Sequence, residues 1–477
     1  MNTNKNLAIK EIENNAEKVV EISDKIWEYS ELSLKEYKSA KLYCEELKKQ
    51  GFTVDEGICN ISTAFSASFG NGKPIIGILA EYDALSGLSQ VGGTTEKQAV
   101  IEGESGHGCG HNLLGAGAFA AALGIKNYLE NSKTQGTVVL YGCPGEEGGA
   151  AKSFMARDGL WYNLDAALTW HPSDCNEVAT GSTNSCIQVM YTYHGIASHA
   201  AGSPERGRSA LDAVELMNIG VQFLREHMSP KARIHYAITN GGGVSPNVVQ
   251  AEASVLYMVR SNKVKEAVEL QARVDKIAEG AALMTETTYT RQFIDGLSDT
   301  IQNHSLESVL FKNYEELGVP NYTEAEKEYA EKLASTYDCD GYTAGTGSEN
   351  FEYASKVKEM QKGALNDFLM PLYTGDAFGA GSTDVGDVSW QCPTAQIYVT
   401  AWPNGCPGHS WQNVSSAKSS IGHKSAIHAG KVICATAIDL FENPELLEKA
   451  KQEHKKRTAE GYTCPIPEDA VPTIINL

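Results

Sequence analysis

Long apolar runs are missing from this sequence. Among its 477 residues, no stretch reaches the roughly 18 apolar residues that a membrane-spanning helix needs. The first residues, MNTNKNLAIKEIENNAEKVV, are polar and charged and lack the apolar core of a secretion signal. We therefore expect a chain that does not insert into a membrane and that resides in the cytoplasm.

Positive charge is also scarce. Lysine and arginine number 40 against 60 aspartates and glutamates, which gives a formal net charge of −20 and an isoelectric point of about 5.1. A surface this acidic repels phosphate backbones, so nucleic acid is excluded as an expected partner. With 42% hydrophobic and 21% charged residues, the composition is otherwise that of an ordinary soluble globular protein.

Regularly spaced cysteines are absent as well. The 11 cysteines form an odd number without a recurring short spacing, so we expect reduced thiols and not a disulfide framework. The sequence also contains no internal repeat and no long low-complexity tract. Because 477 residues are too many for one hydrophobic core, we expect two domains.

Buried strands alternate with helices over most of the chain. The segment KPIIGILAEYDAL contains a buried strand that ends in a loop at 81–85. The small residues of LLGAGAFAAALGIKNYLE (113–130) predict a helix that packs closely on a sheet, and further strands are predicted within 136–149, 165–172 and 395–410. This alternation predicts an α/β fold.

Residues 185–295 follow a different pattern. Strands are expected within 185–200, 247–260 and 287–293, separated by helices at 209–228 and 264–286. This β-α-β-α-β order predicts a compact α+β module, inserted into a larger domain made of residues 1–184 and 296–477. Segment 340–380, rich in Gly, Ser, Asn and Lys, predicts a long surface excursion.

Side chains that bind metals fall at the ends of the predicted strands. Cys109 and His111 come just before a helix, and five others directly follow strands: Asp83, Glu146, Glu147, His171 and His409. In open α/β sheets, ligands gather at the carboxyl ends of the strands. A single histidine at such a place is more often a hydrogen-bonded structural residue, but the conjunction of several favours a metal site.

Five of these residues suit two metal ions. They are of types that bind zinc, manganese or cobalt: Cys109, His111, Glu147, His171 and His409. Five ligands are too many for one catalytic ion. They suit two metal ions that share one ligand and activate a water molecule to attack a carbonyl carbon. Glu146, beside Glu147, can then take a proton, and Asp83 can orient a ligand from behind. A structural zinc knuckle is the alternative, but the second short-spaced Cys or His pair that it needs is not nearby.

Six motifs follow one another along the chain: AEYDAL (80–85), GHGCGHN (106–112), PGEEGG (144–149), TWHP (169–172), GIASHAAGSP (195–204) and CPGHS (406–410). Together they resemble the aminoacylase/carboxypeptidase G family of dimetal metallopeptidases, in the amidohydrolase branch that includes hippurate hydrolases and auxin-conjugate hydrolases. The likeness spans nearly the whole chain. It implies a catalytic domain with a central mixed sheet flanked by helices, and an inserted α+β lid domain that dimerises.

The resemblance implies roles for the residues at the strand ends. It implies two divalent ions, zinc or manganese, with Cys109 as the bridge and four further ligands: His111, Glu147, His171 and His409. It implies Glu146 as the general base and Asp83 as support behind the ligands. Two features depart from the family pattern. Asn112 replaces an aspartate, and Glu81 lies in a motif that has lost its usual Arg-Ala-Asp-x-Asp form. His107 matches the first histidine of its motif, and we expect it to form a hydrogen bond without binding metal.

The inserted domain supplies three of the remaining implied residues, and the larger domain supplies the others. His199 matches a histidine that reaches the active site of a partner subunit and helps to hold the carbonyl oxygen. Asn247 and Arg260 match positions that hold a substrate carboxylate, which suits a guanidinium fork; a surface salt bridge is the alternative for Arg260. The pocket lining is expected to include Ser382, Thr383 and Asp384.

The activity implied is hydrolysis of the amide bond of an N-acyl amino acid, a small molecule with a free carboxylate. Within that class the favoured substrate is p-aminobenzoyl-glutamate, cleaved to p-aminobenzoate and glutamate. A dipeptidase or another N-acyl-amino-acid hydrolase is the alternative in the same class. A non-catalytic partner subunit and a structural metal protein are the alternatives from other classes. We expect a homodimer, or a heteromer with a related subunit.

Overall fold

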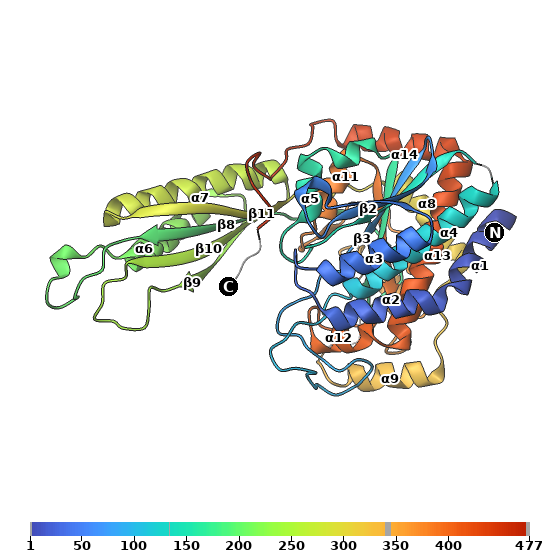
Figure 1. Ribbon diagram of the computed structural model, residues 1–477, viewed down its shortest axis with the longest axis horizontal. Helices are drawn as coiled ribbons and strands as arrows, with labels where there is room; N and C mark the ends of the chain where they lie inside the picture. The colour runs from blue at the N-terminus through green and yellow to red at the C-terminus, as the bar shows by residue number, and fades with distance from the viewer. Residues whose placement is uncertain (1, 133, 339–344, 474–477) are drawn as a thin grey trace. The chain divides into compact units, whose positions relative to one another are not determined.

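A computed structural model describes residues 2–132, 134–338 and 345–473 (Figure 1). The chain divides into two compact units. Unit 1 comprises the residues up to Ser182, Ile301–Gly379 and Val388–Tyr462. Unit 2 comprises Thr183–Thr300, Ala380–Asp387 and the described residues from Thr463 onward. Unit 2 therefore takes a short segment from late in the chain in addition to its central stretch.

Unit 1 is built on a seven-stranded mixed sheet with the strand order β1-β2-β4-β3-β5-β13-β6. The neighbours β4, β3, β5 and β13 are parallel to one another, whereas β1, β2 and β6 pair antiparallel with their neighbours. The strands are β1 (Thr53–Glu56), β2 (Phe65–Asn71), β3 (Ile75–Ala80), β4 (Gly136–Gly142), β5 (Ala166–Ser173), β6 (Glu177–Ala179) and β13 (Thr394–Thr400). The central strands are almost entirely buried, as parallel strands covered by helices are. This confirms the predicted α/β class.

Helices α4 (His111–Ser132) and α13 (Ser420–Glu442) pack against each other and against the sheet. Small residues allow this close approach: a Cβ at Gly117 would lie 2.6 Å from Trp170 Nε1 and 2.8 Å from the carbonyl oxygen of Ala426. Further helices of unit 1 are α1 (Thr3–Asn14), α2 (Ala16–Tyr29), α3 (Tyr37–Lys49), α5 (Ala151–Arg157), α8 (His304–Leu317), α9 (Glu324–Ala334), α10 (Phe351–Met360), α12 (Trp411–Ala417) and α14 (Pro444–Arg457). Helix α11 (Val385–Gln391) begins in the segment assigned to unit 2 and ends in unit 1.

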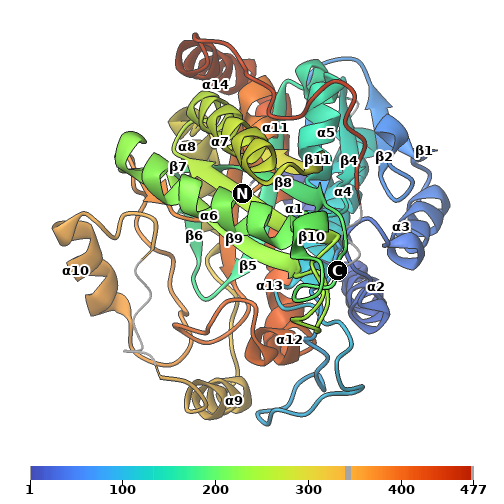
Figure 2. The same ribbon diagram turned by 90° about the vertical axis from the view of Figure 1, so that its left-hand side faces the viewer.

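Unit 2 contains an antiparallel sheet with the order β11-β8-β10-β9. Its elements are β8 (Ser185–His194), α6 (Ala210–Leu224), β9 (Arg233–Asn240), β10 (Glu252–Ser261), α7 (Val264–Thr285) and β11 (Thr288–Leu297). The two helices pack against each other and against β8 and β10 (Figure 2). Tyr191, Tyr193 and Val255 are fully buried in this separate core.

Strand β9 is missing from the predicted β-α-β-α-β order, so the true order is β-α-β-β-α-β. It is the outer strand of the sheet, and most of its residues are exposed or half-exposed. Tyr236 and Ile238 lie on it with 41% and 47% exposure. An edge strand of this kind lacks a clear alternation of apolar and polar residues, which is why the pattern did not predict it.

Segment 345–379 is more than a surface excursion, contrary to the prediction for 340–380; residues 339–344 lie outside the described part of the chain. Helix α10 buries Val357, and the loop after it buries Leu365, Asn366 and Met370. Asn366 Nδ2 donates to the carbonyl oxygen of Asp174 at 2.7 Å. Because Asp174 directly follows β5, the segment supports one of the functional strand ends. Its polar composition concealed the few buried side chains that anchor it.

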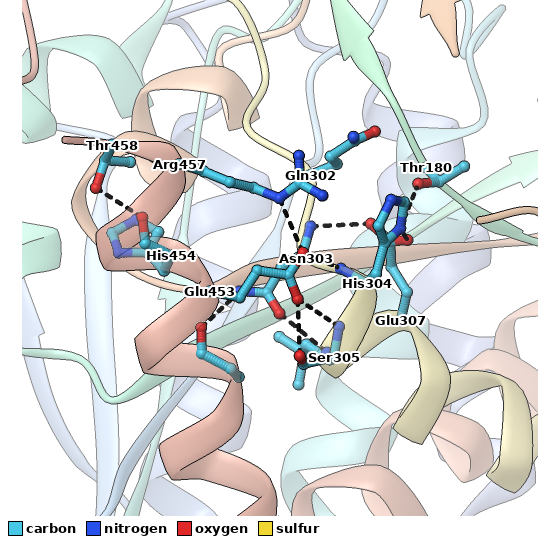
Figure 3. A network of polar contacts seen from close by, with 12 residues as sticks. Thr180, Gln302, Asn303, His304, Ser305, Glu307, Glu453, His454, Arg457 and Thr458 are labelled. Atoms are coloured by element: carbon cyan, nitrogen blue, oxygen red, sulfur yellow. Dashed lines mark hydrogen bonds and ion pairs between the residues drawn. The ribbon is translucent and has the colours of Figure 1, made fainter. Parts of the chain in front are cut away.

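The chain re-enters unit 1 at Ile301, and a network of polar contacts fixes this point (Figure 3). Glu453 on α14 accepts hydrogen bonds from the backbone N–H groups of His304 at 3.0 Å and Ser305 at 2.8 Å, the first residues of α8. Arg457 donates to the same carboxylate at 2.8 Å. Because N–H groups at a helix start have no partner inside the helix, Glu453 docks α8 onto α14.

Short strands and turns complete the chain. The two-residue strands β7 (Ser182–Thr183) and β12 (Phe378–Gly379) pair with each other. Single 3-10 turns occur at Ile58–Asn60, Leu160–Asn163, Pro204–Arg206 and Arg225–His227. Among all the helices in the described ranges, none combines the length and the apolar character needed to span a membrane.

Candidate metal centre

Four parallel strands bring separate segments to one edge of the unit 1 sheet. Side chains follow β3, β4 and β13 or lie near the end of β5; in chain order they are Glu81, Asp83, Glu146, Glu147, His171 and His409. Helix α4 begins at His111, directly after the loop that carries Cys109. Because the carboxyl ends of parallel strands meet at one edge, residues from distant parts of the sequence become neighbours there.

Cys109 belongs to two groups of potential metal ligands. One group is Cys109, His111 and His171, and the other is Cys109, Glu147 and His409; within each group the ligand atoms lie within 4.8 Å of one another. Cys109 Sγ lies 3.4 Å from His171 Nε2. The structure therefore brings together all five residues proposed as ligands, and it gives Cys109 the shared place that a bridging ligand would take.

A carboxylate orients the ring of His111. His111 Nδ1 lies 2.8 Å from Asp83 Oδ1, so the ring donates its Nδ1–H to Asp83, and Nε2 is the nitrogen that can bind a metal ion once it has lost its proton. Asp83 Oδ2 in turn accepts the hydroxyl of Ser33 at 2.7 Å and the backbone N–H of Glu147 at 2.9 Å. Asp83 is thus hydrogen-bonded to two candidate ligands, His111 and Glu147.

Two possible metal-ligand atoms at this edge of the sheet form no hydrogen bond within the described ranges of the chain. His111 Nε2 and Glu147 Oε1 are buried, and neither has a hydrogen-bond partner among the described residues. His171 contacts the carbonyl oxygen of Pro172 through Nδ1 at 2.7 Å, which leaves its Nε2 lone pair facing Cys109. Buried polar atoms are rarely left unpaired. A thiolate, two imidazoles and a carboxylate arranged in this way fit divalent cations.

Burial shifts the protonation of these groups. It raises the pKa of the Cys109 thiol, with Glu147 adding to the effect, and it raises the pKa of Glu147 itself. Burial also lowers the pKa of His171 to about 4. For Asp83 burial opposes ionisation, but the contact with His111 outweighs it and the pKa is lowered. A bound cation deprotonates a coordinating thiol or carboxylate, so metal binding would release protons from this cluster.

Glu81 and Lys152 form a buried ion pair that the sequence did not predict. Lys152 Nζ lies 2.7 Å from Glu81 Oε1, and the two side chains are 0% and 3% exposed. Glu81 Oε2 lies 3.3 Å from His111 Nε2, and Glu81 forms a third ligand group with His111 and Glu146. Burial alone would raise the pKa of Glu81, but Lys152, His111 and His171 outweigh it and lower the pKa. A lysine in a short run of small residues gives no sequence signal that it is buried.

His107 and Asn112 belong to the support of the loop. His107 Nε2 lies 3.0 Å from the carbonyl oxygen of Ile26, and burial followed by the proximity of His111 lowers the pKa of His107 to about 4. Asn112 Nδ2 donates to Ser23 Oγ at 3.0 Å and to the carbonyl oxygen of Ala417 at 3.1 Å. His107 therefore ties the loop to α2 and forms the hydrogen bond expected of it, and Asn112 ties the start of α4 to α2 and α12.

The residues predicted for the inserted domain lie in unit 2. His199 is exposed, and its Nδ1 accepts hydrogen bonds from the backbone N–H groups of Ala201 at 3.2 Å and Gly202 at 3.0 Å. This arrangement puts the ring proton on Nε2, which is then available to donate. Asn247 is exposed, and its backbone carbonyl oxygen accepts a hydrogen bond from the backbone N–H of Ala200 at 3.0 Å. Asn247 therefore lies beside the loop that carries His199.

Arg260 has no carboxylate within ion-pair distance among the described residues. Its guanidinium contacts Met258 Sδ at 3.2 Å, the carbonyl oxygen of Ala380 at 3.4 Å and Ser382 Oγ at 3.5 Å. The surface salt bridge considered for this residue is therefore not formed here. Asp384 is fully buried two residues beyond Ser382, with Thr383 between them.

Comparisons with known proteins place the chain among peptidases. The model of peptidase family M20/M25/M40 matches residues 77–400. The chain is 45% identical over 470 residues to a subunit of p-aminobenzoyl-glutamate hydrolase from Escherichia coli (strain K12), covering 97% of each. It is 28% identical over 469 residues to Xaa-Arg dipeptidase of Mus musculus, covering 96% of this chain and 93% of the relative.

The fold is shared with solved structures. A dinuclear metal-binding peptidase of family M20 from Bacillus subtilis matches with a TM-score of 0.53 and 14% identity, covering 88% of this chain and 98% of that one. This match, the family model and the long alignment with the relative from Escherichia coli agree with the resemblance predicted from the motifs and confirm it. The chain belongs to peptidase family M20/M25/M40 and is a hydrolase that acts on amide bonds.

Proposed function

We propose that the chain is a dimetal amidohydrolase that cleaves p-aminobenzoyl-glutamate to p-aminobenzoate and glutamate. The observation that carries the dimetal part is Cys109, whose Sγ belongs to both ligand groups. The substrate is proposed from the 45% identity, over 97% of both chains, to the p-aminobenzoyl-glutamate hydrolase polypeptide of Escherichia coli. That substrate is an N-acyl amino acid with free carboxylates, the class predicted from the motifs.

In this proposal Cys109 would be a ligand of both divalent ions. His111 and His171 would hold one ion, and Glu147 and His409 would hold the other, as the two ligand groups suggest. The thiolate suits zinc, whereas imidazole and carboxylate also suit manganese. When bound, the ions supply the Lewis acidity that activates water and polarises the amide carbonyl.

Glu146 moves the proton. As the general base, it takes a proton from the attacking water and returns it to the nitrogen of the leaving amine. Its place beside His111 and Glu81, with ligand atoms within 4.8 Å of one another, supports this role. Asp83 holds the proton on His111 Nδ1, so that Nε2 stays available as a ligand.

Unit 2 supplies substrate binding and needs a second subunit. We propose that His199 donates its Nε2–H to the carbonyl oxygen of substrate bound to another subunit. Arg260 and Asn247 bind a substrate carboxylate; Arg260 has no carboxylate partner among the described residues. Asp384 lines the pocket.

The exposed edge strand β9 supports association, because an unpaired edge is open to pairing with another chain. That partner is a second copy or a related subunit, since the relative from Escherichia coli is named as a subunit.

A dipeptidase is the second candidate. It is favoured by the 28% identity to Xaa-Arg dipeptidase, which also extends over 96% of this chain. Both candidates use the same chemistry, so the metal centre does not distinguish them. A panel that includes p-aminobenzoyl-glutamate, benzoyl-glycine and dipeptides ending in arginine does, because turnover of the dipeptides alone would replace the proposed substrate.

The test of the metal-dependent reaction uses purified full-length chain. We expect two metal ions per chain after reconstitution with zinc or manganese, and release of p-aminobenzoate and glutamate. Glu146→Gln should keep the metal content and lose the activity, whereas Glu96→Gln, an exposed control in a loop, should keep both. Loaded protein that hydrolyses no amide, alone or with a related subunit, would contradict the proposal.

A further inference from the structure

The Glu81–Lys152 pair lies at the metal centre, yet none of the roles assigned so far uses it. Lys152 is the second residue of α5 and is completely buried, and Glu81 directly follows β3 and is 2% exposed. A buried charge is strongly destabilising unless it is paired, and a buried pair alone adds little stability over apolar residues. A charged pair at this place therefore calls for a role besides stability.

The second oxygen of Glu81 faces the ring of His111. Glu81 Oε2 lies 3.3 Å from His111 Nε2, and Asp83 accepts a hydrogen bond from Nδ1 of the same ring. His111 Nε2 has no hydrogen bond within the described part of the chain. The two atoms attract at this distance when Nε2 carries a proton, and a metal cation bound there would take the place of that proton. The same two residues and Glu146 form a group whose ligand atoms lie within 4.8 Å of one another.

The balance of charge around the metal centre also favours a cation beside Glu81. Five groups are negative when metal is bound, namely Glu81, Asp83, Glu146, Glu147 and the Cys109 thiolate. Two divalent cations offset four of these charges, and the ammonium of Lys152 offsets the fifth. Lys152 Nζ contacts Oε1 of Glu81 at 2.7 Å, which leaves Oε2 directed toward the histidine.

We propose that Glu81 is a further metal ligand, at the ion held by His111 and His171, and that Lys152 is the positioning residue that holds its carboxylate there. The ion at this position would then have one more carboxylate ligand than the sequence motifs imply. Among the residues that the structure describes, the group of Cys109, Glu147 and His409 has no further carboxylate, and the side chain of His409 is 54% exposed. The two positions should consequently differ in affinity, with the ion at His111 bound more tightly. This proposal rests on the metal centre proposed above.

The test is a metal titration of apoprotein with zinc in competition with a chromophoric chelator. Wild type should bind two ions with distinct affinities. Glu81→Gln, which keeps the volume and a hydrogen-bond acceptor for Lys152, should weaken the tighter position by about 10- to 100-fold and leave the weaker one unchanged. Lys152→Met should weaken the same position. Cobalt bound at that position should also change its visible absorption spectrum in Glu81→Gln.

Two further variants separate a metal ligand from a structural ion pair. Lys5→Met breaks a comparable buried pair with Asp439, at 2.7 Å and with 6% and 11% exposure, and should lower thermal stability without changing either zinc affinity. The double variant Glu81→Gln/Lys152→Met leaves neither charge unpaired, so it should recover stability relative to Lys152→Met but not the zinc affinity. Unchanged zinc affinities in Glu81→Gln and in the double variant would overturn the proposal. Wild type that binds no metal would instead overturn the proposed function.

Discussion

Replacing Asp83 with asparagine tests how the ligand His111 is prepared. Asp83 accepts three hydrogen bonds: from His111 Nδ1 at 2.8 Å, from Ser33 Oγ at 2.7 Å and from the backbone N–H of Glu147 at 2.9 Å. An asparagine has only one oxygen, so its NH₂ group must face one side of this arrangement. Ser33 can rotate its hydroxyl and accept, whereas His111 or Glu147, whichever faces the NH₂ group, must change or lose its hydrogen bond.

Each orientation of the amide disturbs one of the two candidate ligands. If NH₂ faces His111, the ring must move its proton to Nε2, the atom that would bind metal. If NH₂ faces Glu147, the backbone N–H loses its acceptor, which costs about 1–3 kcal/mol of the unfolding free energy. We expect Asp83→Asn to weaken zinc binding by about 10- to 100-fold, as changes behind metal ligands do.

The assay is a zinc titration of apoprotein together with thermal unfolding. Asp24→Asn is the matched control, because Asp24 contacts His423 Nε2 at 2.8 Å on a part-exposed surface of the same unit. It should leave zinc affinity unchanged. If Asp83→Asn binds zinc as tightly as wild type, then Asp83 does not set the protonation of His111 and the assignment of His111 Nε2 as a ligand loses its support.

Two other predictions concern stability and support. Burial lowers the pKa of His428 from 6.5 to about 4, so at acidic pH the unfolded chain binds a proton that the folded chain excludes. The unfolding free energy is therefore unaffected well above pH 6.5 and decreases as the pH falls toward 4. At pH 5 the unfolding free energy is lower by about 2 kcal/mol. His428→Gln, which keeps a donor for the carbonyl oxygen of Gly318, should show a weaker pH dependence of the unfolding free energy measured in urea. The same pH dependence in wild type and variant would contradict this. Asn366→Ala should weaken zinc binding, because Asn366 holds the loop after β5 through its hydrogen bond to Asp174. Asn303→Ala removes a similar buried hydrogen bond elsewhere and should lower stability alone. Equal zinc affinities in the two variants would refute a supporting role for Asn366.

The pattern of the sequence predicted the α/β fold and the place of the metal-type residues for one physical reason. Strands β3, β4, β5 and β13 are buried, so their apolar runs are clear, and the polar residues directly after them mark the strand ends. Parallel strands bring those ends together. This is why the sequence alone predicts that Cys109 and His409, 300 positions apart, lie at one site.

Features that depend on long-range packing were not predictable in the same way. Lys152 is typical of a surface residue in sequence, and only the tertiary structure places it against Glu81. Strand β9 is exposed on the edge of its sheet and lacks an apolar pattern. Segment 345–379 is polar overall, although residues such as Val357 and Asn366 are buried in it. Each of these depends on partners far away in the sequence, which local periodicity does not report.

The most direct test of the metal centre is a cobalt titration of apoprotein, followed through the absorption that a thiolate bound to cobalt produces. Cys109 Sγ belongs to both ligand groups, so the absorption should keep rising until two cobalt ions have bound, and Cys109→Ser should abolish it. Absorption that saturates after one ion, or that persists in Cys109→Ser, would contradict a centre of two metals bridged by this thiolate.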